Sequence, residues 1–380
     1  MQPLTSCLCC DGDLVEVLDL GVTPLANNYR VRQKFPLRVN RCTRCFHLQL
    51  SGSVDPKILF SNYPYFSGTS ETAKTFFREF AQTVRLWHPA ARTVLDIASN
   101  DGSQLDAFAT KNFKTFGVDP SENLSEVARS KGHKVTTDFL ENYPENKTFD
   151  IITAQNVLAH TPTPLAFLKK CRALMHDESS LFVTTSHTNM VMDGEFDSIY
   201  HEHLSYFNSL SLGELAARAE LHIAYIATNP IHGGSLVTCF KKTPCKHAVT
   251  DRVHYEKERG LYRPGTYKAW AMQVNNKVKL IRRMIRQLQD ESYVIVGCGA
   301  AAKGISLLNV ARIQPDFFID TTPAKQGHKA CGAVIHPFEF LREQNKKLAL
   351  LILAWNFEPE VRKTILAHRD DPDDLFLVLK

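Results

Sequence analysis

Two pairs of cysteines near the start of the chain have the spacing of a metal site. Cys7 and Cys10 form the first pair, and Cys42 and Cys45 form the second. Two residues between ligands let both thiolates turn onto one ion, and four thiolates complete the tetrahedral shell that zinc prefers. A full shell leaves no open position, so the pattern predicts a structural zinc ion. Cys9 offers another thiol, but the spacing favours Cys7 and Cys10 as the ligands. The alternative to a metal site is a chance pairing of buried cysteines.

A dense polar cluster surrounds His203. Tyr200 and Glu202 lie beside it, and an unperturbed histidine has a pKa of about 6.5, close to what a general base needs. His201 and His203 form a His-x-His pair that suits a metal, but no third ligand is evident. A solvated loop is the other alternative, and we favour catalysis. A second polar patch lies at 232–235.

Small and polar residues follow a predicted strand at 93–97, in the order Ala-Ser-Asn-Asp-Gly from 98 to 102. Small residues at a strand end let a ligand approach the backbone, and the next helix presents free N–H groups. Asp119 ends the next predicted strand, roughly twenty residues later, where a carboxylate can accept hydrogen bonds from both hydroxyls of a ribose. The arrangement suits a dinucleotide or S-adenosylmethionine; the alternative is an ordinary α/β turn.

The elements that position these residues alternate between strand and helix. Strands are predicted at 93–97, 115–119, 134–137, 149–154 and 180–185, and a final antiparallel pair at 223–226 and 235–240. This alternation indicates a parallel sheet covered on both faces, hence an α/β fold. A strict G-x-G-x-x-G motif is absent and the seven strands end in a hairpin. The pattern therefore favours the Rossmann-like fold of class I S-adenosylmethionine-dependent methyltransferases.

A second strand–loop–helix unit begins at 293–297, after a basic helical region at 251–290. Its loop reads Gly-Cys-Gly-Ala-Ala-Ala-Lys-Gly from 297 to 304, so backbone N–H groups and Lys303 can hold a phosphate. Asp320 ends the next predicted strand, as a ribose-binding carboxylate does. Alone, the unit predicts a dinucleotide site on a Rossmann-like domain; the alternative is a purely structural unit.

Length and composition narrow the class of protein. The chain has 380 residues, too many for one ordinary domain, and 44% of them are apolar, as in globular proteins. A net charge of +5 is small for this length and argues against a nucleic-acid partner. We see no signal peptide, and the most apolar stretch is far shorter than the about 20 residues of a membrane helix. We therefore expect a cytoplasmic protein without a membrane partner.

Several short motifs follow one another along nearly the whole chain. They are Pro-Leu-Ala-Asn at 24–27, Tyr-x-Tyr-x-Ser at 63–67, Ser-Asn-Asp-Gly at 99–102, Asn-Val-Leu-Ala-His at 156–160, Ile-Tyr-His-Glu-His at 199–203, His-Gly-Gly-Ser at 232–235, Gly-Ala-Ala-Ala-Lys-Gly at 299–304 and Ala-Trp-Asn-Phe at 354–357. With the cysteine pairs, they make the chain resemble the nucleotide-linked deoxysugar C-methyltransferases. That family methylates C3 of dTDP-4-keto-6-deoxysugars.

The resemblance implies an organisation and a set of ligands. A small zinc module would occupy 1–55, a helical connector 56–90, the methyltransferase domain 91–245, a helical linker 246–290 and a Rossmann-like domain that binds the nucleotide sugar 291–380. The implied cofactors are S-adenosylmethionine and a structural zinc ion. The implied substrate is a nucleotide-linked 4-keto-deoxysugar, with dTDP as the nucleotide, and we expect a monomer.

The resemblance also assigns roles to residues. His203 would remove the C3 proton, and Glu202 would orient or polarise the His203 ring. Tyr200 and His160 would bind sugar oxygens, and Tyr63 or Tyr65 would close the site. The implied catalytic residues are His203, Glu202, Tyr200, His160 and Tyr65. The implied cofactor-binding residues are Asp96, Ala98, Ser99, Asn100, Asp101, Asp119, Phe139 and Asn156. The implied substrate-binding residues are Tyr63, Ser67, His232, Gly233, Lys303 and Asn356, and the implied metal ligands are Cys7, Cys10, Cys42 and Cys45.

The chain departs from the family pattern at a few positions. Asp96 and Ala98 replace a usual Glu and Gly, and Ala98 adds a methyl group where the backbone approaches the cofactor. We expect cofactor binding to persist in a weakened form. Phe46 replaces the Gly that often follows the last cysteine. Two other classes remain as alternatives: a zinc-containing RNA or small-molecule methyltransferase, and a non-catalytic sugar-nucleotide-binding protein.

Overall fold

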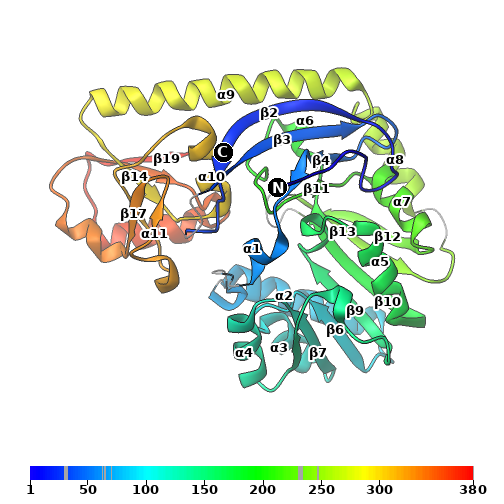
Figure 1. Ribbon diagram of the computed structural model, residues 1–380. Coiled ribbons are helices and arrows are strands. Elements are labelled where there is room, and N and C mark those ends of the chain that lie inside the picture. Colours follow the sequence, from blue (N-terminus) through cyan, green and yellow to red (C-terminus); the bar gives the residue numbers. More distant parts are fainter. Residues whose placement is uncertain are drawn as a thin grey trace.

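Three sheets of four or more strands form the framework of the chain (Figure 1). The computed structural model describes residues 1–29, 33–61, 63, 66–69, 71–229, 234–245 and 248–379. The largest sheet has seven strands in the order β12-β13-β10-β9-β6-β7-β8. Its strands are β6 (Thr93–Ile97), β7 (Lys114–Asp119), β8 (Lys134–Thr137), β9 (Phe149–Gln155), β10 (Met175–Ser186), β12 (His222–Asn229) and β13 (Ser235–Lys241).

The pairing of these strands confirms the predicted α/β sheet. Strands β10, β9, β6, β7 and β8 are parallel to their neighbours, whereas β13 is antiparallel to both β10 and β12. The central strands are buried, because helices cover the sheet. The helices and turns of this region are α1 (Pro56–Phe60), η1 (Ser67–Thr69), α2 (Glu71–Trp87), α3 (Ser103–Ala109), α4 (Glu122–Ser130), η2 (Leu140–Asn142), η3 (Leu158–His160), α5 (Pro164–Ala173), α6 (Met190–Asp193) and α7 (Ser209–Arg218). The seven-stranded sheet therefore presents the carboxyl ends of its parallel strands to one common edge.

A smaller sheet contains strands that the sequence analysis did not predict. Its order is β11-β4-β3-β2, with β2 (Leu14–Pro24), β3 (Lys34–Cys42), β4 (Leu48–Leu50) and β11 (Ser205–Tyr206). Two short strands, β1 (Gln2–Pro3) and β5 (Gly52–Ser53), pair beside it. Strand β11 belongs to the polar segment around His203, so a segment that follows β10 completes the N-terminal sheet.

The C-terminal part carries a six-stranded sheet in the order β16-β17-β15-β14-β18-β19. Its elements are β14 (Val294–Cys298), α10 (Ala302–Ala311), β15 (Phe317–Ile319), η5 (Pro323–Lys325), β16 (Lys329–Ala330), β17 (Ala333–His336), η6 (Phe338–Glu343), β18 (Leu348–Ile352), η7 (Trp355–Phe357), α11 (Glu358–His368) and β19 (Leu375–Val378). Strands β17, β15, β14, β18 and β19 are parallel. The Rossmann-like unit predicted after residue 290 is therefore present.

In the sequence, two helices lie between the seven-stranded and the six-stranded sheet, where we expected one helical stretch. They are α8 (Ala248–Glu258) and α9 (Pro264–Asp290). Gly260 has a φ of 85°, a conformation that favours glycine, and Pro264 begins α9, where its missing N–H costs nothing. Helix α9 runs from the N-terminal sheet to the C-terminal domain (Figure 1). Within the described ranges, no helix is both long and apolar enough to cross a membrane.

The four predicted metal ligands come together beside the N-terminal sheet. The Sγ atoms of Cys7, Cys10, Cys42 and Cys45 all lie within 4.8 Å of one another, with separations of 3.6, 3.5 and 3.4 Å between three of the pairs. Zinc–sulfur bonds of about 2.3 Å in a tetrahedron place the sulfur atoms about 3.8 Å apart. The buried thiol set therefore fits a structural zinc ion. Cys9 is equally buried, but its N–H points at Cys7 Sγ (3.4 Å) and its sulfur stays outside the cluster.

Phe46 keeps the turn that glycine often makes after the last cysteine. Its φ is 56°, in the left-handed region that side chains rarely adopt. Its ring packs against Tyr262 and Tyr267, with centroid distances of 5.6 and 6.1 Å, and Arg41 lies over it at 4.7 Å. These contacts offset the local backbone strain, so the turn survives the substitution.

The thiol cluster predicts a specific response to ligand removal. Cys45→Ser should lower the zinc content from about one ion per chain and lower the thermal midpoint, because metal binding contributes folding free energy. Zinc content by atomic emission and thermal unfolding would measure both effects. Cys9→Ala is the matched control, since it removes a buried thiol outside the cluster. Equal loss of zinc in the two variants would contradict the assignment.

Candidate functional site

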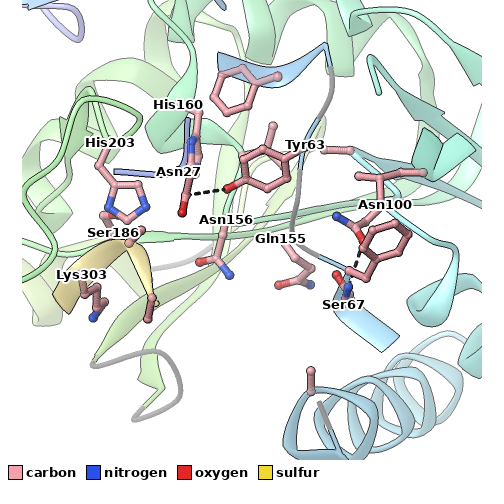
Figure 2. A pocket seen from close by; sticks show the side chains of 18 of the residues that line it. Asn27, Tyr63, Ser67, Asn100, Gln155, Asn156, His160, Ser186, His203 and Lys303 are labelled. Carbon is pink, nitrogen blue, oxygen red and sulfur yellow. Dashed lines mark hydrogen bonds between the residues drawn. The ribbon is translucent and has the colours of Figure 1, made fainter. Parts of the chain in front are cut away.

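A cavity of about 620 Å³ opens at the carboxyl ends of β6, β7 and β9. Side chains from the N-terminal part, the seven-stranded sheet and the C-terminal domain line it. In the view of Figure 2, Asn100 and Ser67 lie on one side, and His203 and Lys303 lie on the other. The predicted residues that line the cavity are Tyr63, Ser67, Asp96, Ala98, Ser99, Asn100, Asp119, Phe139, Asn156, His160, Tyr200, His203, Lys303 and Asn356. Tyr65, His232 and Gly233 lie outside the described residues.

The loop after β6 forms a backbone cradle on one side of the cavity. Ala98 and Asn100 have φ values of 54° and 51°, so Ala98 adopts the left-handed conformation of the glycine it replaces. Ser99 is 3% exposed, and its hydroxyl has no hydrogen-bond partner within the described part of the chain. The hydroxyl is shielded from solvent and lies against Gly117 of β7, so it belongs to the packing of the wall.

Asp119 lies beside this cradle, as predicted from the end of β7. Its carboxylate accepts hydrogen bonds from the N–H groups of Asn100 (2.9 Å) and Ser121 (2.8 Å). Burial raises the pKa of Asp119 above its usual range, and the two N–H donors oppose that shift. Each carboxylate oxygen has a further lone pair, so Asp119 can still accept from a ribose. The cradle and this carboxylate together fit S-adenosylmethionine.

Asp96 has a different environment from Asp119. It is 3% exposed, and its Oδ1 accepts from Thr153 Oγ1 (2.7 Å) and Gln104 Nε2 (2.8 Å). Burial raises the pKa of Asp96 to about 7, against the effect of these two donors. Asp96 therefore braces β6 against β9 and α3, in addition to touching the cavity wall.

Asp101 does not line the cavity, although we expected it to bind the cofactor. Its carboxylate accepts from the N–H groups of Gly68 (2.8 Å) and Ser103 (3.1 Å). Asn100 Oδ1 accepts from Ser67 N–H (2.9 Å), the bond drawn in Figure 2. A Cβ on Gly68 would lie 2.6 Å from Asp101 Oδ2 and 2.5 Å from Ser103 Oγ, so only glycine fits there. Asp101 thus holds the aromatic segment that precedes α2 against the loop after β6.

Gln155 is a cavity residue that the sequence analysis missed. It ends β9, next to Asn156, and neither its amide oxygen nor its amide nitrogen has a partner among the described residues. Figure 2 shows its side chain between Asn156 and Ser67. The available signal was its place at the end of a parallel strand, where open α/β sheets bind ligands.

His203 lies on the opposite side of the cavity, with both ring nitrogens engaged. Its Nδ1 is 2.9 Å from the Ser198 carbonyl oxygen, and its Nε2 is 2.7 Å from the Tyr200 hydroxyl. A carbonyl can only accept, so this bond places the proton on Nδ1 and the lone pair on Nε2. Burial holds the pKa of Tyr200 well above its usual range, so the phenol stays neutral and donates to Nε2.

Glu202 has partners other than His203, which we expected it to orient. Its Oε2 accepts hydrogen bonds from Asn27 Nδ2 (2.9 Å) and from the Tyr63 hydroxyl (3.0 Å). Glu202 is 3% exposed, and burial raises its pKa to about 7, although both donors lower it. Asn27 was absent from the predicted site residues, although it belongs to a motif that supports the resemblance. Glu202 acts on the cavity through Asn27 and Tyr63, which line it.

His160 lies at the end of η3, against the His203 ring. The two ring centroids are 4.9 Å apart in an edge-on arrangement, and Phe60 packs on the other side at 5.6 Å. Burial lowers the pKa of His160 to about 4, so its imidazole is neutral near pH 7. Its Nδ1 has no hydrogen-bond partner within the described ranges. The ring lines the cavity, although this nitrogen is itself shielded from solvent.

The C-terminal domain presents the start of α10 to the cavity. Lys303 lies in the first turn, and its Nζ is 3.1 Å from Asp197 Oδ2. Asp320 resembles a ribose-binding carboxylate, but its oxygens accept from Ala300 N–H (2.7 Å), Thr322 N–H (2.8 Å) and Lys325 Nζ (3.1 Å). The carboxylate is thus engaged by its own domain, and it also lines the cavity.

Three family models match successive parts of the chain. They are described as "Putative zinc binding domain" at residues 7–60, "Methyltransferase domain" at 70–225 and "C-methyltransferase C-terminal domain" at 230–375. These three ranges correspond, in order, to the part with the thiol cluster, the part with the seven-stranded sheet and the part with the C-terminal sheet. The cofactors expected for this combination are S-adenosylmethionine and structural zinc, and the residues described above fit both.

Individual proteins are similar to all or part of this combination over different lengths. C-methyltransferase NovU from Streptomyces niveus is 27% identical over 394 residues, which cover 95% of this chain and 92% of that protein. A ubiquinone biosynthesis O-methyltransferase from Actinobacillus pleuropneumoniae is 29% identical over 106 residues, 25% of this chain and 45% of that enzyme. An S-adenosylmethionine-dependent methyltransferase structure from Clostridium acetobutylicum matches 44% of this chain and 91% of its own, at 13% identity and a TM-score of 0.39. The three successive domain matches and the relative that covers 95% of the chain identify it as an S-adenosylmethionine-dependent C-methyltransferase with an N-terminal zinc-binding domain.

Proposed function

We propose that this enzyme methylates C3 of a dTDP-linked 4-keto-6-deoxysugar. The observation that carries the proposal is the His203 imidazole, whose lone pair on Nε2 faces Tyr200 at the wall of a cavity shared by three parts of the chain. A ketone at C4 makes the neighbouring C3–H acidic, so a neutral imidazole can remove that proton. The family match supports carbon as the atom that accepts the methyl group.

The residues around His203 suit proton removal followed by charge stabilisation. The Tyr200 hydroxyl occupies Nε2 at 2.7 Å, and we expect it to turn to the sugar O4 when substrate enters, which frees the lone pair. The high pKa of Tyr200 keeps it a neutral donor for the developing oxyanion. His160, also neutral, offers a second polar contact to the sugar. Bound S-adenosylmethionine supplies an electrophilic methyl group carried by a positively charged sulfur.

The C-terminal domain supports the choice of a sugar nucleotide. Ala301 is the N-cap residue of α10 and its side chain cannot cap the helix, so the N–H groups of the first turn remain available at the cavity wall. Lys303 adds a positive charge there, and Asp197 holds it in place at 3.1 Å. A diphosphate matches this combination of helix terminus and cation. Asn356, in η7, lines the same wall and can bind a neutral polar part of the ligand.

The role of His203 can be tested by its replacement. His203→Gln should fold and bind S-adenosylhomocysteine, but lose both solvent exchange at C3 and methylation by about 10²–10⁴-fold, the usual contribution of a general base. Deuterium incorporation into the sugar, followed by NMR, measures the exchange without methyl transfer. His176→Gln, at the far end of β10, is the control and should exchange at the wild-type rate. Wild-type exchange in His203→Gln would refute the assignment.

The nucleotide can be tested by thermal shift. A ligand at about 100 times its Kd stabilises a protein by about 2.7 kcal/mol. We expect dTDP to raise the thermal midpoint more than GDP, CDP or UDP, with and without S-adenosylhomocysteine. Lys303→Met should reduce the shift caused by dTDP and leave the shift caused by S-adenosylhomocysteine unchanged. A larger shift with another nucleotide would reject dTDP as the carrier.

Glu202 gives a prediction about pH. Its folded pKa of about 7 lies above the ordinary value of 4.5, so the folded protein binds this proton more tightly than the unfolded chain does. The stability that this proton contributes is complete below about pH 4.5 and is lost as the pH rises through about 7. Glu202→Gln cannot ionise, so its thermal midpoint relative to wild type should rise between about pH 5 and pH 8. Thermal unfolding across this range checks the trend.

An exposed carboxylate provides the control for this measurement. Glu178→Gln makes the same carboxylate-to-amide change at an exposed position on β10, so it measures what the chemical change alone does to the midpoint. The buried Asp96 titrates in the same window, but it is present in every variant, so its contribution cancels in the comparison. A constant difference for Glu202→Gln would show that Glu202 ionises normally in the folded protein.

A further inference from the structure

The position of the proton on the His203 ring depends on one carbonyl group. Nδ1 lies 2.9 Å from the Ser198 carbonyl oxygen and 3.3 Å from the Ser186 hydroxyl, while Nε2 lies 2.7 Å from the Tyr200 hydroxyl. Both hydroxyls can donate or accept, so they tolerate either tautomer. Of these three contacts, only the carbonyl distinguishes the two tautomers, because it requires a donor on Nδ1. Among these contacts, the carbonyl is therefore the one that favours a lone pair on Nε2, the form that a base needs.

A second donor holds the same carbonyl. The Tyr206 hydroxyl donates to the Ser198 carbonyl oxygen at 3.2 Å. Tyr206 is fully buried, and a carbonyl oxygen has two lone pairs, so it accepts both His203 and Tyr206. Two donors from different directions limit the rotation of the peptide group more than one donor does.

Tyr206 in turn takes its position from the N-terminal sheet. In β11, Ser205 pairs with Gln49 and Tyr206 pairs with Leu48 of β4, which follows the second cysteine pair. His47 Nε2 is 3.2 Å from Ser205 Oγ. The Tyr206 hydroxyl is therefore placed by the sheet beside the thiol cluster, and also by the end of β10, because the Phe207 N–H donates to the Ser186 carbonyl oxygen at 2.9 Å.

Asn208 adds a direct link between this segment and the thiol cluster. It is fully buried, caps α7 through Ser211 N–H (2.8 Å), and donates from Nδ2 to the Cys45 carbonyl oxygen (3.1 Å). The backbone on both sides of Tyr206 is thus fastened, one side to β4 and the other to the second cysteine pair. This leaves the phenol ring little freedom to move away from Ser198.

We propose that Tyr206 is a positioning residue that keeps His203 in the tautomer with its proton on Nδ1. The proposal rests on the proposed role of His203 as the base. Without the Tyr206 hydroxyl, the Ser198 carbonyl loses one of its two donors and can turn away from Nδ1. The Ser186 hydroxyl then donates to Nδ1, Nε2 carries the proton, and the imidazole no longer offers a lone pair towards Tyr200. The fraction of enzyme with a competent base falls, while the binding sites for cofactor and nucleotide stay unchanged.

The test compares two tyrosine-to-phenylalanine substitutions in the full-length enzyme. Tyr206→Phe removes the hydroxyl at Ser198. Tyr267→Phe is the matched control, because Tyr267 is also fully buried and donates to a backbone carbonyl, that of Phe46 at 3.5 Å. Protein with ¹⁵N-labelled histidine, at about pH 8 where an unperturbed imidazole is neutral, reports the tautomer through the two ring-nitrogen shifts. Comparison with His203→Gln assigns the His203 signals.

We expect the wild-type and Tyr267→Phe proteins to show the Nδ1–H tautomer of His203. In Tyr206→Phe, the two nitrogen shifts should move towards each other, and kcat should fall by about 10-fold, the lower range for loss of a group that orients a functional histidine. KM and the Kd values for S-adenosylhomocysteine and dTDP should stay unchanged. The wild-type spectrum alone tests the proposal even if Tyr206→Phe does not fold.

Several results would overturn the proposal. They are an Nε2–H tautomer in wild type, unchanged His203 shifts in Tyr206→Phe, and a shift of the tautomer without a change in kcat. Failure of this proposal can also be distinguished from failure of the proposed function. Wild-type C3 exchange in His203→Gln removes the catalytic role of His203, whereas the nitrogen shifts still report whether Tyr206 controls the tautomer.

Discussion

The segment from 195 to 208 can be buried only because every part of the chain supplies partners for its polar groups. Trp270 on α9 donates to the Glu195 carbonyl (2.8 Å), and Ser306 on α10 donates to the Ile199 carbonyl (2.8 Å). Asn27 donates to Glu202, and the Leu204 N–H donates to the Ala159 carbonyl (2.7 Å). An unpaired buried polar group costs about 1–3 kcal/mol, so this segment is stable only when the parts dock together. The site is therefore a property of the assembled chain.

Burial of this segment also determines the protonation of the groups around the cavity. The same loss of water that raises the pKa of Glu202 to about 7 lowers the pKa of His160 to about 4. Desolvation disfavours the charged form of either kind of group, so a carboxyl and an imidazole shift in opposite directions. Near neutral pH, the His160 ring on the cavity wall is therefore uncharged. The proposed role of His203 as a base requires that ring to be neutral as well. Docking and chemistry thus depend on the same exclusion of water.

The C-terminal domain shows how a motif can resemble one site and serve another. Gly299 has a φ of 82° and its missing side chain leaves room for Ala354, while a Cβ on Gly304 would lie 2.3 Å from Leu353 Cβ. Both glycines are therefore explained by packing inside the domain. Asp320 is engaged by Ala300, Thr322 and Lys325. The domain offers to the cavity the start of α10 with Lys303, Asn356 and the Asp320–Lys325 pair, which is consistent with a second ligand.

Much of the fold was determined by the sequence itself. Continuous apolar runs predicted the strands of the seven-stranded sheet, and cysteine spacing predicted the thiol cluster, because both patterns depend on near neighbours in the chain. Strands β2, β3 and β4 were missed, although buried Phe35, Leu37 and Val39 alternate with exposed residues along β3, the pattern of a half-buried strand. The domain boundaries remain predictions. Tertiary structure alone decided that β11 joins the N-terminal sheet, that Glu202 binds Asn27 and Tyr63, and that Asp101 holds Gly68. These contacts join residues far apart in sequence, and no local pattern records which distant group will satisfy a buried polar atom.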